Sequence, residues 1–294
     1  MKHQAKNVVK LIGYASGVAA NNIDCALGPW YLFYHPALFH DVGMDVDWQI
    51  IIKAASMSRG MDVMSLVKET VYELGKAVMP SAQLQQPFCV FGGDHSSAIG
   101  TWSAVANAYR DRGDIGLIWI DAHMDSHTPI TSETQNIHGM PLAHLLGEGR
   151  REFIDLFDEY PALKPENICL IGIRSYEAGE EAILTRLGVK VIHMDEIKQR
   201  GIQMVLGDAK RHVLKATCGF GISLDLDGID PNDAPGVGCP EPDGIGGHEL
   251  VCALQELVSN QSILGLEIVE YNPIRDPNHK TAKLAVKLLH AVYG

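Results

Sequence analysis

The chain has 294 residues, of which 46% are hydrophobic and 20% are charged, and its formal net charge is −12. This balance is typical of a globular protein and excludes a disordered chain, and no apolar run is long enough to cross a membrane. The acidic charge repels the phosphates of nucleic acids and favours a cationic small-molecule partner.

The N-terminal stretch resembles a secretion signal only loosely. Lys2 and Lys6 precede an apolar run, but Lys10 interrupts that run and leaves it too short for a signal peptide. We therefore expect a first β-strand at Val8–Tyr14.

The six cysteines are scattered and form no CxxC motif. A large chain with this pattern predicts reduced thiols and a cytoplasmic location.

Short apolar runs alternate along the chain with longer stretches of helical periodicity. Strands are predicted at Val8–Tyr14, Phe88–Gly92, Ile115–Ile120, Asn167–Ile173, Val189–His193, Phe220–Leu226 and Ile263–Val269. Helices are predicted near 62–79, 97–110, 139–147, 178–187, 203–215, 247–259 and 280–292. This alternation predicts a three-layer α/β/α fold with a mainly parallel sheet. The composition does not change along the chain, so we expect a single domain spanning residues 1–294.

Three of the predicted strands run directly into carboxylates and imidazoles. The segments that follow them contain His95, then Asp121, His123 and Asp125, and then Asp225 and Asp227. Ligands of parallel sheets bind beyond the carboxyl ends of the strands, so these side chains are expected to meet there. In an extended chain, side chains two residues apart point the same way, which would align each set on one side.

This composition of side chains predicts a metal site. Four carboxylates at close range cannot all stay ionised without positive charge among them, and two divalent metal ions would supply it. Oxygen ligands with two imidazoles suit Mn²⁺ better than a thiolate-seeking ion, and a metal pair can activate a water molecule. A single motif of this kind is as often a helix cap or a buried histidine. Asp94 is expected to be structural, and Asp230 with Pro231 to form a turn.

Five segments of this sequence resemble motifs of the ureohydrolase family, which includes arginase, agmatinase and formimidoylglutamase. The resemblance rests on the segments 92–96 (GGDHS), 121–125 (DAHMD), 136–141 (NIHGMP), 223–231 (SLDLDGIDP) and 267–273 (EIVEYNP). It is closest to arginase and implies an arginase-like sheet of about eight strands. It further implies two Mn²⁺ per chain, hydrolysis of L-arginine to L-ornithine and urea, and a homo-oligomer, either a trimer or a hexamer.

The resemblance also implies a role for each site residue. The first Mn²⁺ would be held by His95, Asp121, Asp125 and Asp225. The second would be held by Asp121, His123, Asp225 and Asp227, with Asp121 and Asp225 bridging. Asp125 would also relay a proton, His138 would exchange protons with solvent, and Glu270 would hold the guanidinium group of the substrate.

The residues expected to contact the rest of the substrate leave its identity open. The resemblance implies substrate contacts by His127, Ser132, Thr134, Asn136, Glu177 and Glu270. However, His127 stands where arginases usually carry Asn, and Ser175 and Glu177 stand where they carry Asp. Agmatine, another guanidino acid or formimidoylglutamate are therefore alternative substrates. Glu177 would alternatively be an ordinary first-turn residue that faces the helix dipole.

Other classes of protein fit the sequence less well. A metal-dependent deacetylase of related fold would keep a single zinc, whereas the full set of ligands is present here. A phosphoesterase should carry basic residues at the strand ends to hold phosphate, and only Arg174 qualifies. A non-catalytic relative would be expected to have lost a ligand.

Overall fold

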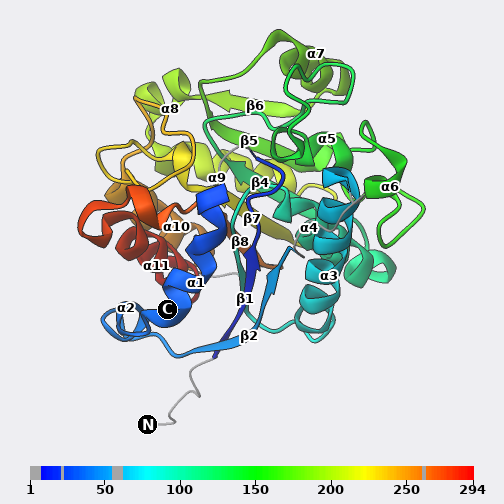
Figure 1. The fold of residues 1–294 in the computed structure, drawn as a ribbon. Coiled ribbons are helices and arrows are strands. Elements are labelled where there is room, and N and C mark those ends of the chain that lie inside the picture. Colours follow the sequence, from blue (N-terminus) through cyan, green and yellow to red (C-terminus); the bar gives the residue numbers. More distant parts are fainter. Residues whose placement is uncertain (1–7, 21–22, 55–61, 260–262) are drawn as a thin grey trace.

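The computed structural model describes residues 8–20, 23–54, 62–259 and 263–294. One parallel sheet of eight strands runs through the molecule in the order β2-β1-β3-β8-β7-β4-β5-β6 (Figure 1). The strands are β1 (Val9–Ala15), β2 (Val46–Lys53), β3 (Phe88–Gly92), β4 (Gly116–Ile120), β5 (Ile168–Ile173), β6 (Lys190–His193), β7 (Phe220–Asp225) and β8 (Leu266–Val269). The predicted mainly parallel α/β fold is confirmed.

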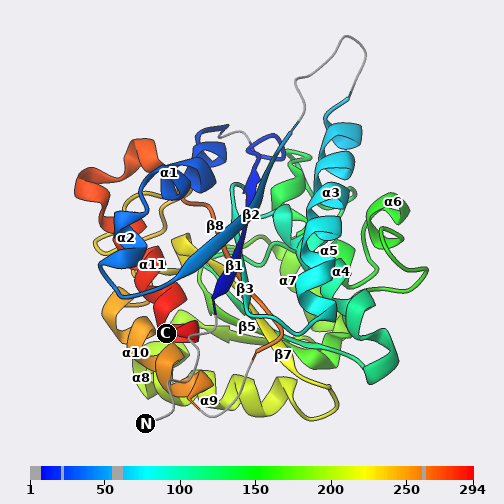
Figure 2. The same cartoon turned by 90° about the horizontal axis from the view of Figure 1, so that it is seen from below.

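Helices cover both faces of this sheet (Figures 1 and 2). One face carries α1 (Gly28–Tyr34), α2 (Ala37–His40), α8 (Met194–Arg200), α9 (Ile202–Val213), α10 (Gly247–Val258) and α11 (Lys280–Tyr293). The other carries α3 (Val63–Gln83), α4 (Ser97–Tyr109), α5 (Pro141–Leu145), α6 (Arg151–Ile154) and α7 (Ala178–Leu187). Successive strand residues alternate between the two cores: Ile118 packs in the first and Trp119 in the second. Burial on both faces explains why the strands are apolar throughout.

The sequence pattern did not predict strand β2. This strand lies at an edge of the sheet and, among the described strands, pairs only with β1, and all of its residues are partly or fully exposed. Exposure removes the need for a continuous apolar run, so the pattern of the buried strands is absent there. The short helices α1, α2, α6 and α8 were also not predicted, because one or two turns carry too little periodicity.

The order of the central strands positions the candidate site. Strands β4 and β7 are neighbours, and their register pairs Ile120 with Leu224, so Asp121 and Asp225 follow side by side. Strand β8 separates β7 from β3, and the segment after β3 carries His95. The carboxyl ends of β3, β8, β7 and β4 therefore deliver the predicted residues to one edge of the sheet.

No helix of the described ranges is both long and apolar enough to cross a membrane. Residues 1–7, which include Lys2 and Lys6, lie outside the described residues.

Candidate functional site

A tight turn after β3 delivers His95. A Cβ on Gly93 would lie 2.0 Å from the carbonyl oxygen of Ser16, so only glycine permits this approach of the two segments. The Asp94 carboxylate points elsewhere and accepts hydrogen bonds from the backbone N–H groups of Ser96 at 3.0 Å and Ala19 at 3.2 Å. Asp94 therefore holds the turn, whereas His95 lies in the site just before α4.

The hydrogen bonds of His95 determine which ring nitrogen is free. The hydroxyl of Ser223 donates to Glu267 Oε2 at 2.9 Å and lies 3.0 Å from His95 Nε2. Since the Ser223 hydrogen is used on Glu267, His95 Nε2 must donate to Ser223, which leaves a lone pair on Nδ1. This Nδ1 is buried and has no hydrogen-bond donor facing it. It lies 3.0–3.2 Å from carboxylate oxygens of three aspartates, Asp121, Asp125 and Asp225.

A lone pair surrounded by carboxylate oxygens fits a cation. Among the described residues, three groups of side chains have ligand atoms that lie within 4.8 Å of one another. The first two share a residue and consist of His95, Asp121 and Asp225, and of Asp121, His123 and Asp227. The third consists of His127, Glu177 and Glu180 and shares no residue with them. Asp121 belongs to both of the first two groups, whereas Asp225 belongs to the first alone. Imidazole nitrogens and carboxylate oxygens are ligands for divalent transition metals, so the residues present fit a two-metal site.

The pKa shifts within the cluster also indicate that a positive charge would stabilise its ionised carboxylates. Burial and the charges of Asp227 and Asp121 raise the pKa of Asp225 well above its ordinary value. Burial likewise raises the pKa of Asp227 to about 6. Burial lowers the pKa of His123, but the facing carboxylates of Asp227 and Asp121 outweigh it and raise that pKa well above its ordinary value. Each shift reflects carboxylates held together in a buried place.

The expected extended geometry of the two aspartate segments is wrong. Strand β4 ends at Ile120, and Asp125 has a left-handed φ of 48°. After β7, the chain forms a short 3₁₀ turn at Leu226–Gly228, in which the Asp225 carboxylate accepts from the Asp227 N–H at 2.9 Å. The side chains converge because their strands are neighbours and their loops fold inward, not because residues alternate along an extended chain.

A cavity of about 220 Å³ opens onto the metal-fitting groups. Every residue expected to contact the substrate lines it, namely His127, Ser132, Thr134, Asn136, Glu177 and Glu270. It is also lined by His123, Asp125, His138, Asp225 and Asp227. The structure therefore brings the predicted substrate contacts together with the predicted metal ligands, except that the fully buried His95 and Asp121 lie behind the cavity wall.

Glu270 and His138 form a pair inside this cavity. Glu270 directly follows β8, is 5% exposed and has a left-handed φ of 65°. Its Oε1 accepts a hydrogen bond from the backbone N–H of His95 at 3.0 Å and lies 3.5 Å from His138 Nδ1. Burial lowers the pKa of His138, but the Glu270 carboxylate outweighs it and raises that pKa to about 9.

The far end of the cavity carries a histidine between two glutamates. His127 Nε2 contacts Glu177 Oε2 directly and lies 3.6 Å from Glu180 Oε2. Glu177 precedes α7 as its N-cap, and its backbone N–H donates to Glu180 Oε2 at 3.1 Å. Glu177 was expected either at a helix start or in contact with the substrate. It lies at the start of α7 and also lines the cavity.

Comparison with known proteins decides the family. The sequence profile described as "Arginase family" matches residues 9–294. The chain belongs to the arginase family. The Bacillus caldovelox arginase is 41% identical over 228 residues, which cover 78% of this chain and 75% of that protein. Its crystal structure superposes with a TM-score of 0.90 at 34% identity, over 98% of each chain. An Entamoeba histolytica arginase in complex with L-ornithine superposes with a TM-score of 0.87 at 25% identity, over 98% of this chain and 99% of that one.

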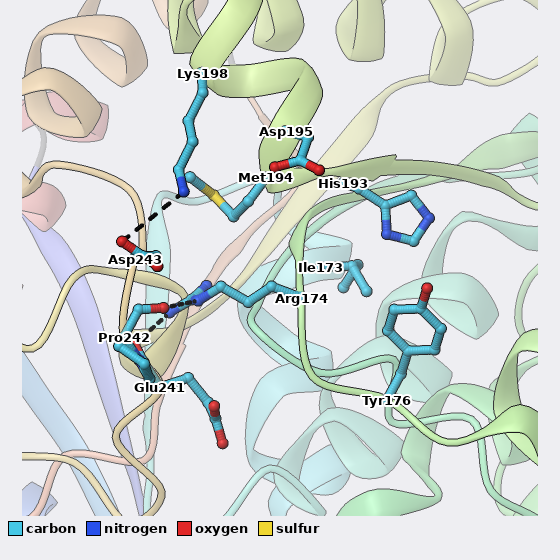
Figure 3. A pocket seen from close by; sticks show the side chains of 10 residues that line it. All are labelled: Ile173, Arg174, Tyr176, His193, Met194, Asp195, Lys198, Glu241, Pro242 and Asp243. Atoms are coloured by element: carbon cyan, nitrogen blue, oxygen red, sulfur yellow. Dashed lines mark hydrogen bonds and ion pairs between the residues drawn. The ribbon is translucent and has the colours of Figure 1, made fainter.

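Membership of the arginase family makes this a hydrolase and removes the deacetylase and phosphoesterase alternatives. The structure agrees, because Arg174 is not available to a phosphate. Its guanidinium donates to the carbonyl oxygens of residues 172, 227, 228, 241 and 242 at 2.7–3.2 Å. Figure 3 shows it reaching Glu241 and Pro242 across a second cavity of about 480 Å³. Arg174 therefore fastens the 231–245 loop to the carboxyl end of β5 and to the turn that follows β7.

Sequence reasoning missed several residues of the site. Glu180 lies three residues after Glu177 at a helix start, which is the spacing of a capping box and could have identified it. Cys239 lines the cavity from the 231–245 loop, and no local pattern distinguishes it. Cys25 contacts Glu270 although the two are 245 residues apart, which sequence periodicity cannot reveal.

Proposed function

We propose that this arginase-family enzyme hydrolyses L-arginine to L-ornithine and urea with two Mn²⁺ per chain. The observation that carries the proposal is the pair of buried metal-fitting groups that share Asp121 and adjoin the cavity lined by Glu270. Relatives named as arginases, which match most of the chain, support the choice of substrate. Two divalent ions, when bound, would supply positive charge to the cluster and a nucleophilic water to the guanidinium carbon.

We assign the metal ligands as the resemblance implies. The first ion would be held by His95, Asp121, Asp125 and Asp225, and the second by Asp121, His123, Asp225 and Asp227. The close approach of Asp125 Oδ2 to His95 Nδ1, at 3.0 Å, supports the first set. The shared place of Asp121 supports a bridging role for this carboxylate.

Glu270 would bind the guanidinium group. A guanidinium has N–H donors in a plane that matches a carboxylate, and such charge-assisted pairs are stronger than neutral hydrogen bonds. Because Glu270 is buried, this pair is screened less by water than a surface pair would be. The carboxylate would thereby hold the guanidinium carbon against the metal-fitting groups.

Proton transfer would use Asp125 and His138. The amine that leaves the guanidinium carbon must gain a proton, and Asp125, which lines the cavity, would pass it the proton that the attacking water gives up. His138 carries its proton at neutral pH because Glu270 raises its pKa to about 9. With 25% of its side chain exposed, the His138 ring connects the cavity to solvent and can replace the proton used.

The far end of the cavity would hold the amino-acid end of L-arginine. The hydroxyls of Ser132 and Thr134 and the amide of Asn136 offer neutral donors to a carboxylate. Glu177 and Glu180 offer acceptors to an ammonium group. The contact of His127 with Glu177 favours a second candidate, a guanidino acid that lacks the α-ammonium, since Glu177 is already paired.

The experiment that tests this proposal is urea release by the manganese-loaded protein. L-Arginine, agmatine and 4-guanidinobutyrate are compared at matched concentration, and metal content is counted in the same sample. Turnover of L-arginine well above the others supports the proposal. Turnover of 4-guanidinobutyrate with little from L-arginine would select the second candidate. No urea from any of the three, with two ions bound, would overturn the proposed reaction and direct the search to formimino compounds.

We further propose a cytoplasmic location and assembly into a trimer or hexamer. The six free cysteines suit a reducing compartment. Sedimentation of the manganese-loaded protein measures its mass directly, and a mass of one chain would contradict the expected assembly.

A further inference from the structure

The Cys25 thiol makes a buried contact with the carboxylate of Glu270. Cys25 lies in the 3₁₀ turn Ile23–Leu27, just before α1, and is fully buried. Its Sγ is 3.2 Å from Glu270 Oε2 and 3.6 Å from the backbone carbonyl oxygen of the same residue. The shorter of the two contacts joins the thiol to the group that would bind the guanidinium.

The start of α1 holds Cys25 in this place. Gly28 begins the helix, and a Cβ on it would lie 2.6 Å from the carbonyl oxygen of Tyr271. The absence of a side chain at Gly28 therefore lets the helix start approach the segment that follows Glu270. Cys25 precedes Gly28 by one turn, and its Sγ therefore lies in contact with the Glu270 carboxylate.

The thiol acts as the donor in this contact. Burial and the adjacent Glu270 charge raise the pKa of Cys25 far above its ordinary value, so it remains an S–H group. An S–H beside a carboxylate oxygen donates to it, although more weakly than a hydroxyl would.

Each oxygen of Glu270 thus has a donor of its own. Oε1 accepts from the backbone N–H of His95 at 3.0 Å, and Oε2 accepts from Cys25 at 3.2 Å. The backbone is fixed as well, because the Glu270 N–H donates to Gly93 O at 2.8 Å. A carboxylate rotates easily about its last bond, and donors on both oxygens remove this freedom. The lone pairs that remain are available to a ligand in the cavity that Glu270 lines.

We propose that Cys25 is a positioning residue for guanidinium binding: its thiol orients the Glu270 carboxylate so that both oxygens can receive the N–H groups of the substrate. Cys25 itself does not touch the substrate. The inference rests on the proposed function and deepens it, because it names the residue that prepares Glu270 for its ligand.

The test compares full-length, manganese-loaded variants. Cys25→Ala and the larger Cys25→Val remove the donor, and Cys25→Ser restores one. Cys169→Ala is the matched control, because Cys169 is also a fully buried thiol, and among the described residues its Sγ hydrogen-bonds to the Leu170 carbonyl oxygen, at 3.8 Å, and to no side chain. For each variant, KM and kcat with L-arginine are measured, and the Kd of the guanidinium ion is measured by calorimetry. That ion is the simplest probe of Glu270.

The expected effect is that of one weak hydrogen bond. Cys25→Ala and Cys25→Val should raise the KM for L-arginine and the Kd of guanidinium about three- to tenfold, with a smaller change in kcat. Cys25→Ser should return both values close to wild type, and Cys169→Ala should change neither. Metal content should be the same in all variants.

Two results would overturn the inference. The first is an unchanged guanidinium Kd in Cys25→Val, since this variant removes the donor and leaves no cavity. The second is a Cys25→Ser variant as impaired as Cys25→Ala, which would mean that packing alone matters. If wild-type protein releases no urea from any guanidino compound, the proposed function fails, and the calorimetric Kd still decides the role of Cys25.

Discussion

The hydroxyl of Ser223 lies 3.0 Å from His95 Nε2 and fixes the imidazole with its Nδ1 lone pair toward the aspartates. Ser223 can do so because its own hydrogen is given to the buried Glu267 carboxylate at 2.9 Å. That carboxylate has no cationic partner among the hydrogen bonds it accepts, which come from Ser97, Thr101, Trp102 and Ser223. The first metal ligand is thus oriented by a fully buried network of hydrogen bonds that ends on the Glu267 carboxylate.

This relationship predicts that Ser223→Ala weakens metal binding. Without the acceptor at Nε2, the His95 ring loses its fixed tautomer, and the Mn²⁺ affinity of the first site should fall about tenfold or more. Calorimetric titration of the metal-free protein measures the change. Ser97→Ala is the matched control, because its hydroxyl donates to Glu267 at 2.8 Å without contacting His95. Equal losses of Mn²⁺ affinity in the two variants would mean that Ser223 does not act by fixing the tautomer of His95.

Removal of Asp227 tests the second metal site. Asp227→Ala should leave one ion bound and lower turnover by more than about 100-fold, which exceeds the usual cost of losing an outer partner of a ligand. Metal analysis after desalting and urea release on the same sample measure both effects. Asp243→Asn, in the exposed part of the neighbouring loop, is the control. Wild-type metal content and rate in Asp227→Ala would contradict the ligand assignment.

Shortening Glu177 tests the far end of the cavity. Glu177→Asp should break the contact with His127 and change the KM for L-arginine about three- to tenfold, with two ions still bound. Glu181→Asp serves as control, since it keeps the charge in the first turn of α7 and does not line the cavity. If no substrate shows a changed KM, Glu177 is only a residue of the helix start.

The pKa of His138 gives a prediction about pH. In the folded protein, the Glu270 carboxylate raises this pKa from 6.5 to about 9, so the proton is bound more tightly than in the unfolded chain. The pair therefore stabilises the fold fully below the unfolded value, and the stabilisation is lost as pH rises toward about 9. NMR titration of the metal-free protein measures the pKa directly. Glu270→Gln should lower it, and the same raised value in that variant would exclude Glu270 as the cause.

The sequence predicted those features that depend on burial and chain order. Seven of the eight strands were expected near their observed places, because burial on both faces makes each an apolar run. Strand β2 lacks that signature because it lies at an exposed edge. The side chains of Asp121 and Asp225 were expected to meet because their strands end at one edge of the sheet. Their turns were not foreseen, because side-chain hydrogen bonds such as Asp225 to the Asp227 N–H set them.

Contacts between segments that are distant along the chain could not be predicted from the sequence. The pairing of Cys25 with Glu270 depends on how closely α1 approaches the end of β8, and the cysteine has no neighbouring motif. Similarly, Arg174 was weighed as a phosphate ligand, whereas the fold uses its guanidinium to fasten the 231–245 loop. Residue type suggested the chemistry in each case, but only the tertiary structure assigns the partner.

The most direct test of the central claim is titration of metal-free protein with Mn²⁺, with bound metal and urea release from L-arginine measured on each sample. The account predicts that binding saturates at two ions per chain and that urea release rises with their binding. Saturation at one ion, or full occupancy by two ions with no urea, would contradict the two-metal mechanism proposed for this site.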